Sequence, residues 1–299
     1  ASVPRWASPK IQKSTKWTNL QHDFSLFLND MPPKRQARQE AGDGDPQPST
    51  SRASREADEV EEIDGEVFNT QASTQSKKLM ASLSDDVKQR KVNDLVQYLL
   101  IMDQKKYPIK RTDINKMVLK EHSRAFLSFM EEATVVLREV FGLVLVEVDS
   151  AKSYILINDF EQDVEHPLEW SPKDNMRMAL VMIILSVIFM KGNVLTDVEL
   201  AEFLKKLGVD MDTPHEAFGD VKKQISEFIK QGYLTCTKQM NVEPPKHEYR
   251  WGVRAKHELP KRYALDFVAQ IYGTDTPERW ILQYQDMLES EQQDSNGAS

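Results

Sequence analysis

The sequence predicts a mainly α-helical α+β fold with small β-hairpins, in which one order of elements occurs twice. Amphipathic helical patterns are followed by two short β-rich runs, and the second half of the chain repeats this order. Residues 179–190 are also apolar except for one serine. This run is shorter than the roughly 18 to 20 residues of a bilayer span and longer than a strand of about 4 to 8 residues. It therefore predicts a helix buried on nearly all sides.

Residues 1–83 are predicted to form a disordered N-terminal tail. From 31 to 78 the chain is rich in Pro, Gly, Ser, Thr, Gln and Glu, with Phe68 as its single aromatic residue. Such a segment cannot bury enough apolar surface to offset a backbone ordering entropy of about 1 to 2 kcal/mol per residue. Residues 1–30 are compatible with a leader that is not native or with an authentic tail. A second disordered tail is predicted at 290–299.

The first half, residues 84–160, is predicted to contain three helices and a hairpin. Ser84 opens a helix that runs to about Lys106, and Pro108 follows it. Thr112 and Asp113 cap a second helix, and a third is expected from about 124 to 141. Two β-rich runs, 143–148 and 153–157, are separated by four residues, which is a hairpin signal.

The second half, residues 161–289, is predicted to repeat this order. Ser171 and Pro172 open the buried helix, which is expected to end near Lys191 with Gly192 in the left-handed conformation. Thr196 and Glu199 have the spacing of a capping box. The remaining expected elements are a third helix capped within 213–216, strands at 232–237 and 247–251, and helices at 261–272 and 277–289.

Three helices followed by a hairpin is the order of elements in a winged helix. The sequence therefore predicts two tandem winged-helix units, the second of which carries two additional C-terminal helices.

Composition excludes several classes of function. The net charge is −8, so any DNA contact has to use a local basic face. Cys236 is the single cysteine, which excludes an intrachain disulfide and a cysteine-rich zinc site and favours a reducing compartment. The chain lacks the G-x-x-x-x-G-K-[ST], H-E-x-x-H and G-x-S-x-G motifs. We therefore expect no enzyme activity, cofactor, metal, small-molecule substrate or membrane association.

Several short motifs occur in one order along residues 88–289. They are Phe141-Gly-Leu143, Val146-Glu-Val-Asp149, Ser153-Tyr154, Val187-Ile-Phe-Met-Lys-Gly-Asn193, Phe203-Leu204, Leu207-Gly208, Tyr249-Arg-Trp-Gly252 and Arg254-Ala255. In this set and order they resemble the MAGE (melanoma-associated antigen) homology domain family.

The resemblance implies two tandem winged-helix units and a non-catalytic role. Family members bind and modulate RING-type ubiquitin ligases. The member that this chain resembles most works in a chromosome-maintenance SMC complex, where it pairs with a RING subunit and a kleisin subunit and contacts DNA. The resemblance thus implies a scaffold in the nucleus on chromatin, with the cytoplasm as a second location. Two alternatives remain, a MAGE adaptor that recruits substrates to another RING ligase and a winged-helix transcription regulator.

Three sets of residues are candidates for these contacts. Leu99 and Leu100 match a dileucine that the family uses against its RING partner, although adjacent leucines on an amphipathic helix are ordinarily core. A kleisin groove is expected in the second unit at Phe203, Leu204 and Phe228, which are equally compatible with internal positions. The candidate contacts to double-stranded DNA are Lys105, Lys106, Lys110, Arg111, Arg250, Arg254, Lys256, Lys261 and Arg262, for which solvated helix ends are the alternative.

Overall fold

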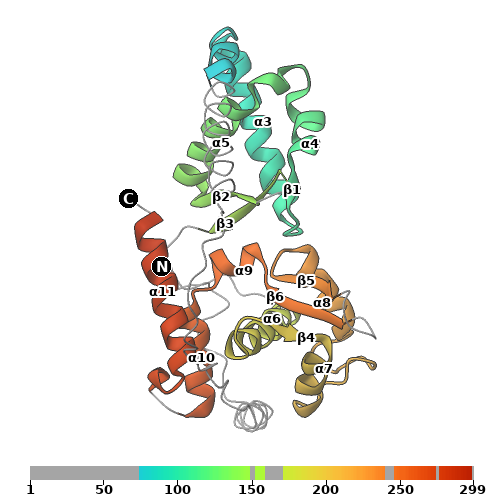
Figure 1. Ribbon diagram of the computed structural model, residues 1–299. Helices are drawn as coiled ribbons and strands as arrows, with labels where there is room; N and C mark the ends of the chain where they lie inside the picture. The colour runs from blue at the N-terminus through green and yellow to red at the C-terminus, as the bar shows by residue number, and fades with distance from the viewer. Residues whose placement is uncertain (1–73, 149–151, 159–170, 240–245, 274–275, 298–299) are drawn as a thin grey trace, which may run out of the picture.

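The computed structural model describes residues 74–148, 152–158, 171–239, 246–273 and 276–297. Their fold is mainly helical with two small antiparallel sheets, as predicted (Figure 1). Most of the predicted N-terminal tail lies outside the described residues. Within the predicted tails, residues 74–81 are helical and α11 continues to Gly297.

The first half packs its helices on a three-stranded sheet. Its elements are α3 (Asp85–Asp103), β1 (Ile109–Lys110), α4 (Arg111–Ile114), a π-helix (Asn115–Leu119), a 3-10 helix (Lys120–Ala125), α5 (Phe126–Phe141), β2 (Leu143–Val148) and β3 (Ser153–Asn158). β3 lies between β1 and β2, and the hairpin pairs Val144 with Ile157 and Val146 with Ile155. This order is compatible with a winged helix.

The predicted second helix is not one continuous α-helix. The chain passes from α4 through the π-helix to the 3-10 helix, and Lys120 has a φ of +50° between them. The helix at 74–81 also adds to this half. Ser76 shares a hydrogen bond of 2.9 Å with the hydroxyl of Ser128 on α5, and Met80 joins the core.

The second half repeats the arrangement and extends it. Its elements are α6 (Pro172–Met190), β4 (Leu195–Thr196), α7 (Asp197–Lys206), α8 (Val221–Lys230), β5 (Leu234–Gln239), β6 (Lys246–Trp251), α9 (Val253–Glu258), α10 (Lys261–Tyr272), a 3-10 turn (Pro277–Arg279) and α11 (Ile281–Gly297). β6 lies between β4 and β5, as β3 does in the first sheet. Figure 1 shows α10 and α11 side by side on the outside of this half.

α6 is the central helix of the second half, as its apolar sequence predicted. Ser171 accepts a hydrogen bond from the amide of Asp174, Pro172 stands in the first turn, and Gly192 has a φ of +83°. Residues Leu180–Leu185 and Val187–Met190 of this helix are buried. The indole Nε1 of Trp251 donates to the carbonyl of Leu185 at 2.8 Å, which ties β6 to the helix.

The capping box before α7 is confirmed, and the cap of α8 differs from the prediction. The amides and side chains of Thr196 and Glu199 bond reciprocally. The side chain of Asp220, rather than a residue of 213–216, accepts from the amide of Lys223 at the start of α8. Phe218 therefore lies before the helix, where it anchors the loop in the core.

Candidate functional site: the joint between the two halves

The first candidate pair, Leu99 and Leu100, is divided between the core and the surface. Leu99 is 0% exposed in the first core, whereas Leu100 is half-buried at its edge. The next two residues of α3, Ile101 and Met102, are exposed. Of the predicted pair, only Leu100 therefore offers surface to a partner, beside two exposed apolar neighbours that the sequence did not single out.

The three candidate groove residues are internal. Phe203, Leu204 and Phe228 are buried in the second core, the first two on α7 and the third on α8. They pack against α6 and its neighbours and form no open wall. These three side chains therefore do not line a docking groove.

The candidate DNA contacts separate into three groups. Lys105, Lys110 and Lys256 are exposed, and within the described residues no carboxylate pairs with them. The second group holds local partners. Four of its members form ion pairs: Lys106 with Asp103, Arg250 with Glu248, Lys261 with Asp286 and Arg262 with Glu291. The fifth is Arg111, whose guanidinium lies 4.3 Å from the ring centroid of Phe126. Arg254 forms the third group, because it is 0% exposed. The expectation that Arg254 contacts DNA is therefore wrong, because its side chain does not reach the surface.

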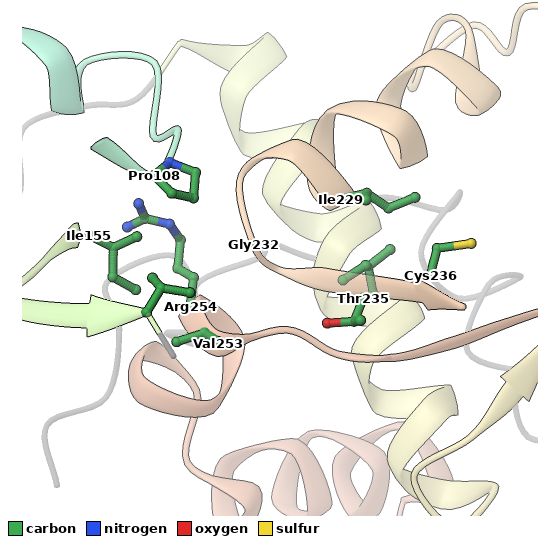
Figure 2. A pocket seen from close by; sticks show the side chains of 10 residues that line it. Pro108, Ile155, Ile229, Gly232, Thr235, Cys236, Val253 and Arg254 are labelled. Atoms are coloured by element: carbon green, nitrogen blue, oxygen red, sulfur yellow. The ribbon is translucent and has the colours of Figure 1, made fainter. Parts of the chain in front are cut away.

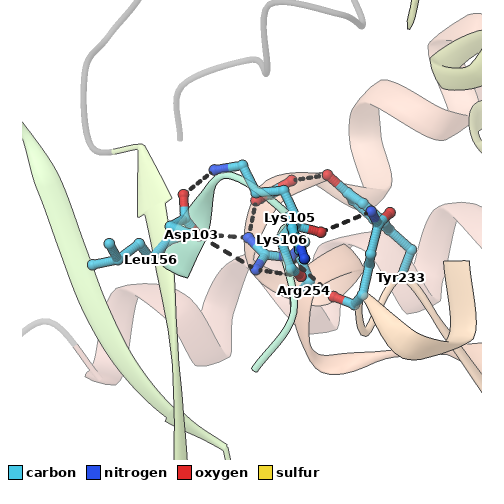
Figure 3. A network of polar contacts seen from close by, with 8 residues as sticks. Asp103, Lys105, Lys106, Leu156, Tyr233 and Arg254 are labelled. Atoms are coloured by element: carbon cyan, nitrogen blue, oxygen red, sulfur yellow. Dashed lines mark hydrogen bonds and ion pairs between the residues drawn. The ribbon is translucent and has the colours of Figure 1, made fainter. Parts of the chain in front are cut away.

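Arg254 lies where the two halves meet, and all three of its side-chain nitrogens donate hydrogen bonds (Figure 3). Nε donates to the carbonyl of Gln231 at 3.0 Å and Nη1 to the carboxylate of Glu258 at 2.9 Å, both within the second half. Nη1 also donates to the carbonyl of Leu156 at 2.9 Å and Nη2 to that of Lys106 at 3.1 Å, both in the first half. One planar group thus holds acceptors from both halves.

Two glycines allow Arg254 to reach this position. A Cβ on Gly252 would lie 2.1 Å from the carbonyl oxygen of Gly232, a distance that no side chain tolerates. The amide of Gly252 donates to the carbonyl of Tyr233 at 2.8 Å, and the amide of Arg254 donates to that of Gly232 at 3.0 Å. This close approach of two backbone segments fixes the start of α9, and α9 in turn packs on β3.

Two further hydrogen bonds cross the joint. The amide nitrogen of the Gln231 side chain donates to the carbonyl of Lys105 at 3.1 Å, and the hydroxyl of Tyr107 donates to Glu227 at 2.6 Å. The second bond raises the pKa of Tyr107 and lowers that of Glu227. Lys106, which lies between Lys105 and Tyr107 in the sequence, has a φ of +60°, a conformation uncommon for residues other than glycine.

Burial has the largest effect on the pKa values of two titratable side chains at the joint, Asp103 and Tyr233. It raises the pKa of Asp103, although Lys106 and Arg254 lower it. It also raises the pKa of Tyr233 well above its ordinary value, helped by the carboxylate of Glu258, to which the tyrosine hydroxyl donates. Asp103 Oδ1 lies 3.8 Å from Nη2 of Arg254 and has no hydrogen-bond partner.

A cavity of about 260 Å³ lies beside Arg254 (Figure 2). The first half contributes Pro108, Val148 and Ile155 to its lining, and the second half contributes Ile229, Gly232, Leu234, Thr235, Cys236, Val253 and Arg254. Cys236 is half-buried rather than a core residue, and burial raises the pKa of its thiol. A raised pKa favours the thiol over the reactive thiolate at neutral pH.

The sequence did not predict this joint. The motif that contains Arg254 was recognised, but a sequence pattern does not distinguish a buried arginine from an exposed one.

Two general findings concern the described residues alone. They contain no group of three or more His, Cys, Asp or Glu side chains placed to hold a metal ion. Among their helices, none combines the length and the apolar character that a membrane span needs.

The fold and the sequence together define a class of protein. The MAGE homology domain pattern matches residues 95–262, so the chain belongs to the MAGE homology domain family. It is 40% identical over 204 residues to the human non-structural maintenance of chromosomes element 3 homolog, covering 68% of this chain and 67% of that protein. The mouse protein of the same name is 42% identical over 205 residues, covering 68% of this chain and 73% of its own length.

Other relatives are longer. Human melanoma-associated antigen D2 is 38% identical over 205 residues, which are 68% of this chain and 34% of that protein. The chain thus spans about a third of that relative. Among solved structures, a chain of the Nse1-Nse3-Nse4 complex matches with a TM-score of 0.65 and 40% identity, covering 69% of this chain and 100% of that chain.

Proposed function

We propose that this protein is a non-catalytic scaffold that binds and stimulates a RING-type E3 ubiquitin ligase subunit and binds a kleisin subunit. Its setting would be a nuclear SMC complex that maintains and repairs chromosomes. The observation that carries this proposal is the match, at 40% identity, to the full length of one chain of the Nse1-Nse3-Nse4 complex. The similarity to the element 3 homologs, of which it covers two thirds or more, supports the same role.

We propose the C-terminal end of α3 as the surface for the RING subunit. Leu100 is half-buried there, and Ile101 and Met102 are exposed beside it. A leucine that becomes buried at an interface contributes roughly 1.5 to 3 kcal/mol, so truncating it weakens binding about tenfold or more.

The test separates Leu100 from Leu99. Leu100→Ala is expected to weaken co-purification of the RING subunit about tenfold or more with unchanged circular dichroism. Leu99→Ala is expected to lower the free energy of unfolding by about 2 to 5 kcal/mol, because it leaves a cavity in the core. Unchanged RING binding by Leu100→Ala, measured by titration of the purified subunits, would remove this surface from the proposal.

We propose that the kleisin binds the second half. Because Phe203, Leu204 and Phe228 are internal, the positions to substitute first are the exposed apolar residues Val198, Ile281 and Leu282. A helix that docks by its apolar face needs such anchors. Loss of kleisin binding after charged substitution at one of them, with RING binding retained, is the expected result.

For DNA we propose weak, salt-sensitive backbone binding through the exposed Lys105, Lys110 and Lys256. The residues that hold a local partner are further candidates: Lys106, Arg111, Arg250, Lys261 and Arg262. Each phosphate contact releases counterions, so binding of this kind falls steeply as salt rises. A mobility shift at low salt that disappears as salt increases is expected, and no shift at low salt would contradict DNA binding.

Affinity purification followed by mass spectrometry distinguishes the alternatives. Recovery of SMC subunits with the RING and kleisin subunits supports the proposal. Recovery of a different RING ligase with its substrates would favour the MAGE adaptor. Recovery of neither, together with sequence-specific DNA binding, would favour a transcription regulator.

A further inference from the structure

We propose that Arg254 fixes the angle at which the two halves of the molecule meet. The inference concerns this chain alone and does not depend on which partners the halves bind. It starts from the two hydrophobic cores, which share no residue: the first runs from Met80 to Leu156 and the second from Met178 to Met287. Each half thus has an interior of its own, and the contacts at the joint decide how one lies on the other.

The apolar contacts at the joint hold the halves together without fixing their angle. Ile155 is buried there but belongs to neither core, and it lies against the cavity that Val253 and Pro108 also line (Figure 2). Hydrophobic attraction has no preferred direction. Moreover, these apolar side chains line a pocket of about 260 Å³ that is partly open to solvent.

The hydrogen bonds of Arg254, in contrast, are directional. Its guanidinium is planar and presents its donors in a fixed fork. Nε donates to the carbonyl of Gln231 and the amide of Arg254 donates to that of Gly232, so the second half sets the guanidinium plane. Nη1 and Nη2 then meet the carbonyls of two separate first-half segments, Leu156 on β3 and Lys106 after α3. Two acceptors bound to one rigid plane fix the angle between the halves, whereas a single acceptor would not fix it.

We call the two hydrogen bonds from Arg254 to the carbonyls of Leu156 and Lys106 the clamp. The charges around it permit it to form and break reversibly. Within the first half Asp103 pairs with Lys106, and within the second half Arg254 pairs with Glu258. Each half therefore keeps a neutralising partner for its own buried charge when the clamp opens. The groups that opening exposes are carbonyls and a guanidinium, which water solvates readily.

The test measures the angle directly. Spin labels are attached at Val135→Cys on α5 and Val198→Cys on α7, which are each 52% exposed, in a Cys236→Ser background, because Cys236 is the only other cysteine. Pulsed electron resonance then gives the distance distribution between the halves. We expect one narrow distribution in the parent protein and a broader or divided one in Arg254→Lys, since lysine keeps the charge but loses the planar fork.

Two matched variants complete the design. Arg262→Lys makes the same change in the exposed pair with Glu291, away from the joint, and is expected to keep the narrow distribution. Tyr107→Phe removes another contact across the joint, the hydrogen bond from Tyr107 to Glu227, and is also expected to keep the narrow distribution, because the hydrogen bonds of Arg254 remain.

Three results would overturn the proposal. An unchanged distribution in Arg254→Lys would show that Arg254 does not set the angle. Equal broadening in Tyr107→Phe would assign the angle to the joint as a whole. Loss of helical circular dichroism in Arg254→Lys would make Arg254 a folding residue of the second half instead of a clamp.

Discussion

Asp103 has two cationic neighbours, Lys106 and Arg254, and still its pKa is raised, because burial is the larger effect. A raised pKa means that the folded state holds the proton more tightly than the unfolded state does. The stability that the protonated carboxyl provides is therefore fully present below its ordinary pKa of 3.8 and is lost as the pH rises through its folded pKa.

Asp103→Asn tests this sign. Asparagine resembles the protonated acid and does not ionise, so the variant should gain stability relative to the parent protein as the pH rises from about 4 to neutral. Thermal melting of both proteins across that range measures the difference. Asp86→Asn, an exposed change on the same helix, corrects for the loss of one negative charge. A relative gain that instead grew toward acidic pH would contradict the assignment.

At the scale of single residues, the sequence indicated which motifs matter but did not predict which of their side chains are buried. Leu99 and Leu100 have the same side chain and are adjacent, yet one is core and the other reaches the surface, because successive helical positions point about 100° apart. Arg254 was expected among exposed basic residues and is fully buried. Its partners are main-chain carbonyls distant in sequence, which no local pattern reveals.

At the scale of elements, α7 depends on its first turn. The hydroxyl of Thr196 accepts from the amide of Glu199 at 3.3 Å, and the carboxylate of Glu199 accepts from the Thr196 amide at 2.9 Å. Burial opposes ionisation of Glu199, but the hydrogen bonds from Thr196 and the charge of Lys191 outweigh it and lower the pKa. The box satisfies two amides that a helix start otherwise leaves free.

Thr196→Ala is expected to lower the free energy of unfolding by about 0.5 to 2 kcal/mol, the usual cost of losing a helix cap. Urea unfolding measures it. Thr196→Ser keeps the hydroxyl and serves as the control, with most of the stability retained. Equal losses in the two variants would show that the methyl group, rather than the cap, matters.

Long or strongly patterned elements were the predictable ones. α3, α5, α6, α10 and both hairpins were expected close to where they occur, because runs of apolar residues with helical or strand spacing mark them in the sequence. The strands Ile109–Lys110 and Leu195–Thr196 have only two residues each, too few for a period. α9 was also missed, since its six residues bury Arg254 and Ala255 instead of an apolar stripe.

At the scale of the whole molecule, two separate cores imply two units of stability. Ile184 is buried in the middle of α6, and Asp at that position places an unpaired charge in the second core. We expect Ile184→Asp to cost more than about 4 kcal/mol and to unfold the second half. Hydrogen exchange should then lose protection over 171–297 and keep it over 85–148.

The control for this substitution is Ile184→Val, which should cost only about 0.5 to 1.5 kcal/mol. An unchanged melting temperature in Ile184→Asp would contradict the central place of α6. Loss of hydrogen-exchange protection in both halves would show that the first half does not stay folded when the second unfolds.

The first half meets Arg254 and the side chain of Gln231 through main-chain oxygens, those of Lys105, Lys106 and Leu156. A substitution at any of these three positions changes a side chain and leaves the acceptor in place. An insertion or deletion between α3 and β1, however, moves two of the acceptors at once. For these three hydrogen bonds the number of residues in the turn matters, whereas the side chains of Lys105 and Lys106 do not take part. Tyr107 differs from them in the same turn, because its side-chain hydroxyl donates to Glu227 across the joint.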